Sequence, residues 1–198
     1  MTDEELLREA SRGVEAAFLE LYERHKTAVF RFAFRLLNSV ELAEDVAHDC
    51  FLSLIKQPQK FDSTRASLRT YLYAAARNLA MKHFRRAGHL VAVDDLLTEP
   101  PAPDSQQPLY QALDKEISAL VQRAVASLPP LQREALVLFE YEELPLSEIG
   151  KIVCADVGTV KARLYRARQA LKRSLSGYFA EQTETCVLEE AFKSTTVR

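Results

Sequence analysis

Two segments of the chain are rich in arginine and lysine and contain no aspartate or glutamate, although all 198 residues together carry a net charge of −2. These basic segments are residues 65–86 and 158–173. Residues 40–55 show the reverse pattern, with several carboxylates and neither lysine nor arginine. Segregated charge of this kind is typical of proteins with surfaces that face a polyanion. Solvated helix faces produce the same composition, so charge alone leaves both interpretations open.

The second basic segment has the spacing of a DNA-recognition helix. Apolar residues recur every three or four positions, which predicts an amphipathic helix. They are Val157, Val160, Leu164, Ala167 and Leu171. A shorter apolar helix is expected at 146–153, and the break at 154–156 predicts a tight turn. Two short helices joined in this way, the second of them basic, predict a helix-turn-helix.

The outward face of this helix carries side chains suited to a DNA groove. Lys161 and Arg166 can donate hydrogen bonds to guanine edges, and Tyr165 can pack on a thymine methyl group. Flanking basic residues suit phosphates, which hold the register without reading the sequence. The residues that we expect at the DNA are Thr159, Lys161, Ala162, Arg163, Tyr165, Arg166 and Arg168. An ordinary amphipathic surface helix is the alternative interpretation.

The first basic segment combines positive charge with aromatic rings. We expect a helix over 65–86, capped by Ser63 or Thr64, with Arg69, Tyr73 and Arg77 opposite its core stripe. The stripe is Leu68, Leu72, Ala75 and Leu79. Rings interleaved with arginines suit single-stranded DNA, because unpaired bases stack on rings while the backbone follows the charge. The alternative is that the aromatic residues are core and the arginines are solvated.

The loop before this helix extends the predicted DNA-binding set. Phe61 and the hydroxyls of Ser63 and Thr64 suit a pocket for an extruded base. The residues that we expect at a single strand are Phe61, Ser63, Thr64, Arg65, Arg69, Tyr71, Tyr73, Arg77, Asn78, Lys82 and Arg85.

A helix is predicted in the acidic segment, and Asp45 and Asp49 lie one turn apart on it. An exposed acidic face suits a basic protein partner, and a solvated face is the alternative. Paired carboxylates also occur in acid–base catalysis, but no third catalytic group accompanies them. His48 and Cys50, two residues apart on a helix, point to different sides, which disfavours a metal site. The sequence therefore favours neither an enzyme nor a cofactor.

The composition favours an all-α fold, with long stretches of strong helix formers and only five glycines. Four of the eight prolines fall within residues 88–108, which predicts a linker. We therefore expect two helical domains, at 1–87 and 109–177, and a tail of unassigned role at 178–198. An acidic start and the lack of an apolar run of about 20 residues predict a cytoplasmic protein without a membrane partner.

These segments resemble those of the bacterial RNA polymerase sigma factors. Residues 43–51, AEDVAHDCF, look like the helix of sigma region 2 that binds core polymerase. Residues 68–80, LRTYLYAAARNLA, look like the segment that melts and reads the minus-ten element. Residues 128–134, LPPLQRE, and 157–168, VGTVKARLYRAR, are similar to the opening of region 4 and to its minus-thirty-five recognition helix. The absence of other sigma regions resembles the extracytoplasmic-function (ECF) subfamily.

The resemblance implies two domains, a region 2 helical bundle and a region 4 helix-turn-helix, joined by a proline-rich linker. It implies that region 2 docks on the polymerase clamp and region 4 on the flap, and that promoter DNA and an anti-sigma factor are further partners. It assigns the polymerase contact to Asp45, His48, Asp49 and Phe51. No catalytic residue, metal or cofactor is implied.

Five positions depart from the family pattern. His48 and Asp49 stand where glutamine and glutamate are usual, and Tyr71 replaces a tryptophan. Cys154 takes the place of a glycine in the turn, where a left-handed backbone costs a non-glycine residue about 1 kcal/mol. Pro145 replaces a serine cap. A stand-alone helix-turn-helix regulator, which would bind its operator without polymerase, remains the alternative function.

Overall fold

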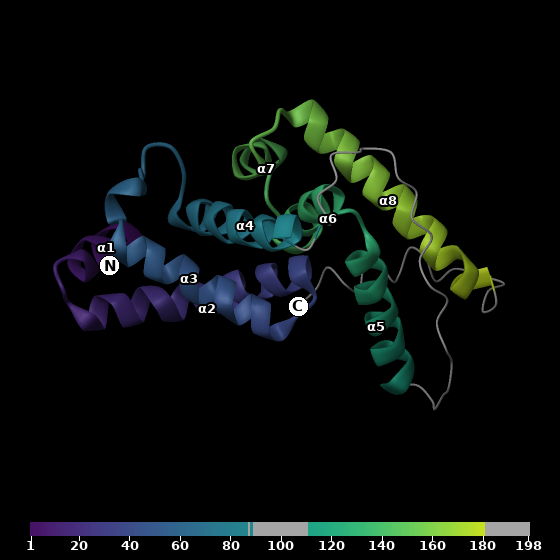
Figure 1. Cartoon of the computed structure of the whole chain (residues 1–198), viewed down its shortest axis with the longest axis horizontal. Helices are drawn as coiled ribbons and strands as arrows, with labels where there is room; N and C mark the ends of the chain where they lie inside the picture. Colours follow the sequence, from purple (N-terminus) through teal and green to yellow (C-terminus); the bar gives the residue numbers. More distant parts are fainter. Residues whose placement is uncertain (87, 89–110, 181–198) are drawn as a thin grey trace.

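The structure, a computed structural model, describes residues 1–86, 88 and 111–180, with side chains described for 1–86, 88 and 117–176. Within these residues every regular element is helical, so the predicted all-α fold is confirmed (Figure 1). Most of the predicted linker and tail lies outside the described residues. No described helix is long and apolar enough to cross a bilayer.

The N-terminal half, residues 1–86, is a bundle built around one long helix. Its elements are α1 (Asp3–Ser11), α2 (Glu15–Leu37), α3 (Val40–Lys56), the short 3₁₀ helix η1 (Pro58–Lys60) and α4 (Leu68–Arg86). Helix α2 packs against α1, α3 and α4, with Phe32, Leu36, Leu54 and Leu72 fully buried between them. Burial of these apolar side chains is the main contribution to the stability of the bundle.

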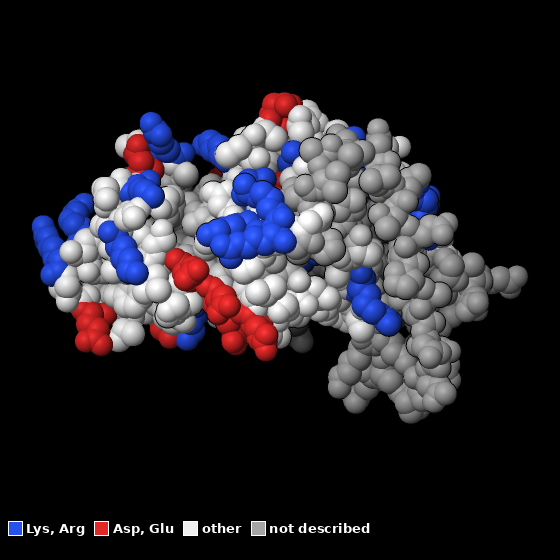
Figure 2. Space-filling model, in the orientation of Figure 1, with Lys and Arg blue, Asp and Glu red and all other residues white. Residues whose placement is uncertain are grey.

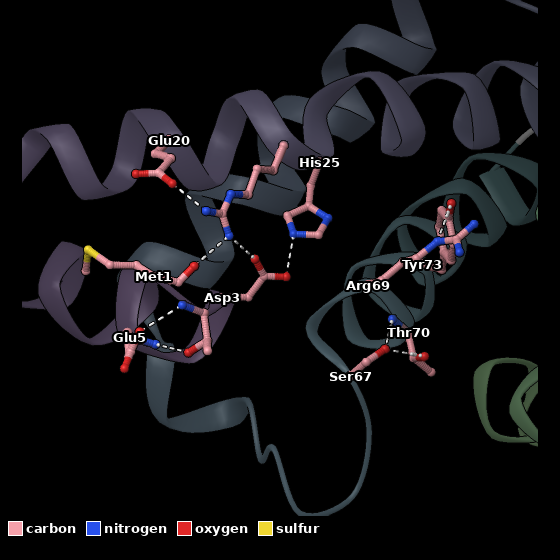
Figure 3. A network of polar contacts seen from close by, with 11 residues as sticks. Met1, Asp3, Glu5, Glu20, His25, Ser67, Arg69, Thr70 and Tyr73 are labelled. Carbon is pink, nitrogen blue, oxygen red and sulfur yellow. Dashed lines mark hydrogen bonds and ion pairs between the residues drawn. The ribbon is translucent and has the colours of Figure 1, made fainter.

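Helix α1 was not expected from the sequence, yet its start carries a clear signal. Thr2 and Glu5 form a capping box, in which each side chain accepts a hydrogen bond from the backbone of the other residue. Asp3 then fixes α1 to α2, because its carboxylate lies 3.1 Å from an Arg24 nitrogen and 2.8 Å from His25 Nε2 (Figure 3). These contacts close the outer end of the bundle.

The turn between α2 and α3 is made by Asn38 and Ser39. Asn38 adopts a left-handed backbone, with φ of 52°, and its N–H donates to Phe34 O. The Ser39 hydroxyl accepts a hydrogen bond from Leu42 N and caps α3. Asparagine tolerates the left-handed region better than most residues, so the two helices turn back tightly on each other.

Helix α4 begins three residues later than predicted, and the predicted cap is wrong. Ser67 is the capping residue, since its hydroxyl accepts a hydrogen bond from Thr70 N at 3.2 Å (Figure 3). Thr64 instead donates to the carboxylate of Asp62 through both its amide and its hydroxyl. The loop before α4 is therefore closed by an Asp62 turn, which leaves Ser63 and Thr64 exposed.

The C-terminal half, described for residues 111–180, holds the predicted helix-turn-helix. Its elements are α5 (Gln111–Ser127), α6 (Pro130–Leu136), η2 (Val137–Tyr141), α7 (Leu146–Val153) and α8 (Val157–Ala180). The segment η2 is a π-helical turn that continues α6, and the N–H of Glu142 donates to Val137 O five residues back. Pro130 occupies the first turn of α6, where its missing N–H removes no helical bond.

The turn between α7 and α8 keeps the geometry usual for a glycine although Cys154 stands there. Cys154 adopts φ of 53° and ψ of 47°, and its N–H donates to Gly150 O. Gly150 supplies the close approach that the turn needs, because a Cβ there would lie 2.8 Å from the backbone oxygen of Ala155. The departure at Cys154 therefore leaves the turn intact.

The two halves pack against each other. Helix α4 contacts α7 and α6, while α2 contacts α5, α6 and η2 (Figure 1). Helix α4 is thus covered on one side by the N-terminal bundle and on another by the C-terminal half.

Substitution of Gly150 by alanine should destabilise the C-terminal half by roughly 1–3 kcal/mol, because the added methyl group meets backbone rather than a movable side chain. Urea unfolding followed by circular dichroism measures the change. Ser147→Ala, an exposed position on the same helix, is the matched control. A Gly150→Ala protein as stable as this control would contradict the predicted clash.

Candidate nucleic-acid interface

The start of α8 is fixed by Asp156. Its carboxylate accepts hydrogen bonds from Thr159 N at 2.9 Å and from the Thr159 hydroxyl at 2.7 Å. These bonds lower the pKa of Asp156, the hydroxyl bond having the larger effect. The predicted inner face of α8 is confirmed from Val160 onward, with Val160, Leu164, Ala167 and Leu171 buried, whereas Val157 at the helix start is exposed. The outer face is consequently set at a fixed angle to α7.

The outer face of α8 is open at three predicted positions. Lys161, Ala162 and Tyr165 are exposed, and Tyr165 has two thirds of its surface accessible, at 66%. Arg166 is half-buried. Arg168 is exposed on the flank, where it contacts the Glu140 carboxylate at 2.7 Å and lies over the Phe139 ring. A cationic and aromatic helix face of this kind has the donors and the shape that a major groove accepts.

Arg163 does not lie with the other predicted DNA-binding residues. Its guanidinium is largely buried, and it donates to Glu134 at 3.0 Å. Arg163 therefore joins α8 to α6 inside the C-terminal half, and its predicted position on the flank of the outer face is wrong. Helical periodicity placed Arg163 at the edge of the apolar stripe, where a long side chain can point either to solvent or toward the protein interior.

On α4 and in the loop before it, the structure divides the basic and aromatic residues predicted at a single strand into two groups. Arg65, Asn78, Lys82 and Arg85 are exposed. Arg69 is half-exposed, Arg77 is largely buried, and Tyr73 is completely buried. The expected position of Tyr73 and Arg77 on a free face is therefore wrong, because the C-terminal half covers that side of α4.

The buried stripe of α4 also differs from the predicted one. It runs through Leu68, Leu72, Ala76 and Ala80, whereas Ala75 and Leu79 are only partly buried. The four-residue spacing turns the inner face toward Tyr73, whose ring packs on Phe32 of α2 with centroids 5.0 Å apart. Burial raises the pKa of Tyr73 to about 12, and a hydrogen bond to Glu142 adds to the shift.

Phe61, predicted in a pocket with Ser63 and Thr64, packs against Tyr71 at the start of α4. Their ring centroids are 5.6 Å apart with an edge-to-face angle of 68°, and both are half-buried. Ser63 and Thr64 lie exposed in the loop between them. This aromatic pair, bordered by hydroxyls, presents a π face and hydrogen-bonding groups beside the start of α4.

Three charged residues that the sequence analysis did not select lie between the halves. Glu134 is 0% exposed and Glu142 is 6% exposed, and the carboxylate of each forms an ion pair with an arginine of α4. Arg133, also buried, donates to the carbonyls of Leu36 and Leu128. Burial lowers the pKa of Arg133 to about 10. The position of Glu134 in the sequence is one signal of its burial, because this carboxylate lies next to the apolar residues Ala135 and Leu136.

The acidic surface of α3 is confirmed as exposed. Glu41, Glu44, Asp45, His48 and Asp49 all face solvent, and Figure 2 shows a row of acidic side chains along α3 beside basic side chains over α4. Such a surface can bind a cationic protein.

Phe51 and Cys50, on the opposite side of α3, face the bundle core. Phe51 is 2% exposed and meets the Tyr22 ring edge-to-face, with centroids 4.9 Å apart. It supports the acidic face from below, so its predicted place in a polymerase-contacting surface is wrong. Burial raises the pKa of the Cys50 thiol to about 12, which keeps it protonated.

Comparisons with known proteins agree with this division of the chain. Residues 21–89 match Sigma-70 region 2, and residues 118–171 match Sigma-70, region 4. The ECF RNA polymerase sigma factor SigW of Bacillus subtilis (strain 168) is 29% identical over 177 residues, covering 85% of this chain and 94% of that protein. The matches run through both halves rather than through the helix-turn-helix alone.

Two solved structures share the fold. CnrH, in complex with the cytosolic domain of CnrY, aligns with a TM-score of 0.64 and 22% identity over 88% of this chain and 97% of that chain. The sigma factor RpoE, in complex with the anti-sigma factor NepR from Bartonella quintana, aligns with a TM-score of 0.60 and 22% identity, over 80% of this chain and 96% of that chain. With both sigma-70 regions present in order, the chain belongs to the ECF subfamily of RNA polymerase sigma factors, proteins that act with core polymerase in promoter-specific transcription initiation and are not enzymes.

Proposed function

We propose that this sigma factor reads the minus-thirty-five element with α8 and captures the melted minus-ten strand with α4 and the loop before it. The observation that carries the first part is the exposed face of α8, where Lys161 and Tyr165 project from the second helix of the helix-turn-helix. The major groove admits one helix, and lysine and arginine donate to guanine acceptors there. Thr159, Ala162, Arg166 and Arg168 complete this surface.

The minus-ten role rests on what lies around the start of α4. The Phe61–Tyr71 pair offers a stacking surface, and Ser63 and Thr64 offer hydroxyls to an unpaired base. The exposed basic residues of α4 and of the loop before it then suit the strand backbone. They are Arg65, Lys82 and Arg85, with Asn78 between them. Arg69, Tyr73 and Arg77 belong to the same proposal; in the structure Tyr73 is buried, Arg77 is largely buried and Arg69 is half-exposed.

We assign binding to core polymerase to the α3 surface of Asp45, His48 and Asp49, because it is acidic, exposed and supported by the buried Phe51. In this division residues 1–87 form region 2, 88–108 the linker, 109–177 region 4, and 178–198 a tail without an assigned role. The protein is expected to act in the cytoplasm, with the polymerase.

An anti-sigma factor is a further partner in this proposal. Support comes from the fold that the chain shares with RpoE, solved with the anti-sigma factor NepR, and with CnrH, solved with the cytosolic domain of CnrY. NepR and the cytosolic domain of CnrY are partners of those two proteins. For this chain, the proposal of an anti-sigma partner rests on the shared fold alone.

Lys161→Ala should lower discrimination among minus-thirty-five sequences by roughly 1–3 kcal/mol, because a contact to a base edge is lost. Reconstituted transcription with core polymerase on a promoter library measures it. Lys172→Ala removes the same charge from the same helix at a position suited to phosphate, and should weaken all promoters alike. Equal, uniform losses in both variants would refute base reading by Lys161.

Asp45→Lys should weaken association with core polymerase by about tenfold or more, equivalent to about 1.4 kcal/mol, because it places a like charge against a basic partner. Co-purification with core enzyme and titration by fluorescence anisotropy test this. The control is Glu23→Lys, the same charge reversal on an exposed position of α2. Normal binding by the Asp45→Lys protein would remove α3 from the polymerase interface.

A further inference from the structure

Asp62 collects hydrogen bonds from three successive residues of the loop between η1 and α4. Its carboxylate oxygen Oδ1 accepts from the Thr64 amide at 3.0 Å and from the Thr64 hydroxyl at 2.6 Å. Its backbone oxygen accepts from the amides of Arg65, at 3.1 Å, and Ala66, at 3.4 Å. These four donors of the loop therefore point inward to one residue, although Asp62 and Thr64 are themselves exposed.

The second carboxylate oxygen of Asp62 has a partner as well. Oδ2 lies 3.2 Å from Nε of Arg65, whose side chain is otherwise open to solvent. The guanidinium keeps its other N–H groups for the phosphates of a strand, which is the role proposed for it above. Both oxygens of the carboxylate thus face groups of the same loop.

The contact with Asp62 gives the Thr64 hydroxyl a defined polarity. The hydrogen bonds from Thr64 hold the pKa of the Asp62 carboxyl below its usual value, the bond from the hydroxyl having the larger effect. An ionised carboxylate only accepts hydrogen bonds, so the one hydrogen of the Thr64 hydroxyl is donated to Asp62. The Thr64 oxygen consequently offers a base its lone pairs and no donor.

Ser63 differs from Thr64 in this respect, although the two side chains are neighbours. Its hydroxyl is exposed and can rotate either to donate or to accept, so it suits every base equally. Of these two hydroxyls, that of Thr64 is the one held by a carboxylate. Discrimination between bases at this loop is therefore expected from Thr64.

The four bases fall into two classes toward a fixed acceptor. Adenine and cytosine carry an exocyclic amino group, at N6 and N4, whereas guanine and thymine carry a carbonyl oxygen at the equivalent positions, O6 and O4. The Phe61–Tyr71 pair does not separate these classes, because every base has a face that stacks on a ring. An extruded base is also read by hydrogen bonds to its edge, and there the two classes differ.

We propose that Thr64 selects the extruded base, with Asp62 as the residue that positions it, and that the loop takes adenine or cytosine in preference to thymine or guanine. This inference rests on the proposed minus-ten role of the loop and adds to it the class of base. An amino group donates to the Thr64 oxygen, whereas a carbonyl oxygen there would meet lone pairs with lone pairs. One neutral hydrogen bond corresponds to a difference in affinity of about three- to tenfold.

The wild-type protein tests this preference without any substitution. Reconstituted holoenzyme is bound to promoter templates whose minus-ten region is left unpaired, so that the stability of the duplex does not enter the measurement. Each position of the strand is varied in matched pairs, cytosine against uracil and adenine against hypoxanthine, which exchange the amino group for a carbonyl oxygen. At one position the amino base should bind about three- to tenfold more tightly.

Substitutions in the loop then assign the preference to residues. Thr64→Val removes the acceptor at almost constant size and should abolish the preference, whereas Thr64→Ser keeps a hydroxyl and should retain it. Asp62→Ala frees the Thr64 hydroxyl to donate, so the ratio of the two affinities should fall toward one. A merely structural role of Asp62 would weaken binding of all bases alike and leave the ratio unchanged. Gln59→Ala, an exposed position of η1, is the control and should keep the wild-type ratio.

Three outcomes would overturn the inference. They are equal binding of amino and carbonyl bases at every minus-ten position, a preference that survives Thr64→Val, and an Asp62→Ala protein with the wild-type ratio. Failure of the proposed function is detected separately, by Phe61→Ala in the same holoenzyme. Unchanged binding and promoter opening in that variant would end the minus-ten role of the loop. A holoenzyme that depends on Phe61 but binds both classes of base equally loses only the present inference.

Discussion

A buried carboxylate that has no contact with water needs positive charge nearby. Glu134 is such a carboxylate, and its ion pairs hold three helices together. Arg77 comes from α4 and Arg163 from α8, while Glu134 itself is carried by α6. Removal of one partner would leave a buried charge inadequately compensated, which proteins tolerate poorly. The orientation of α8 relative to the N-terminal half is therefore tied to one ion-pair network. Apolar packing alone would fix it less sharply, because dispersion contacts have no preferred direction.

Much of the fold follows from the sequence because most helices bury a single face. The periodicity of α8, the short apolar helix α7 and the tight turn between them each have a local physical cause, and each prediction is confirmed. The start of α4 was misplaced because three hydroxyl residues compete for the cap, and only Ser67 lies at the correct distance from Thr70 N. Local propensity cannot choose among such neighbours.

The site was predicted less well than the fold, for a reason visible in α4. Periodicity assigns one inner face to a helix, but α4 is covered from two directions. Tyr73 and Arg77 looked exposed because their partners, Glu142 and Glu134, lie more than fifty residues away in sequence. Phe51 was misassigned because a motif identifies a helix without saying which of its residues reach the surface. Long-range ion pairs of this kind leave almost no local trace.

The π-helical turn η2 gives this arrangement an unusual dependence on chain length. One residue more than an α-helical turn would hold is accommodated between Val137 and Tyr141, and Glu142 follows directly. Loss of one residue from that segment would turn the wide turn into an ordinary α-helical one. Glu142 would then shift relative to Tyr73 of α4 and Arg35 of α2, which contact its carboxylate. The length of this short segment therefore sets a contact between helices that are distant in sequence.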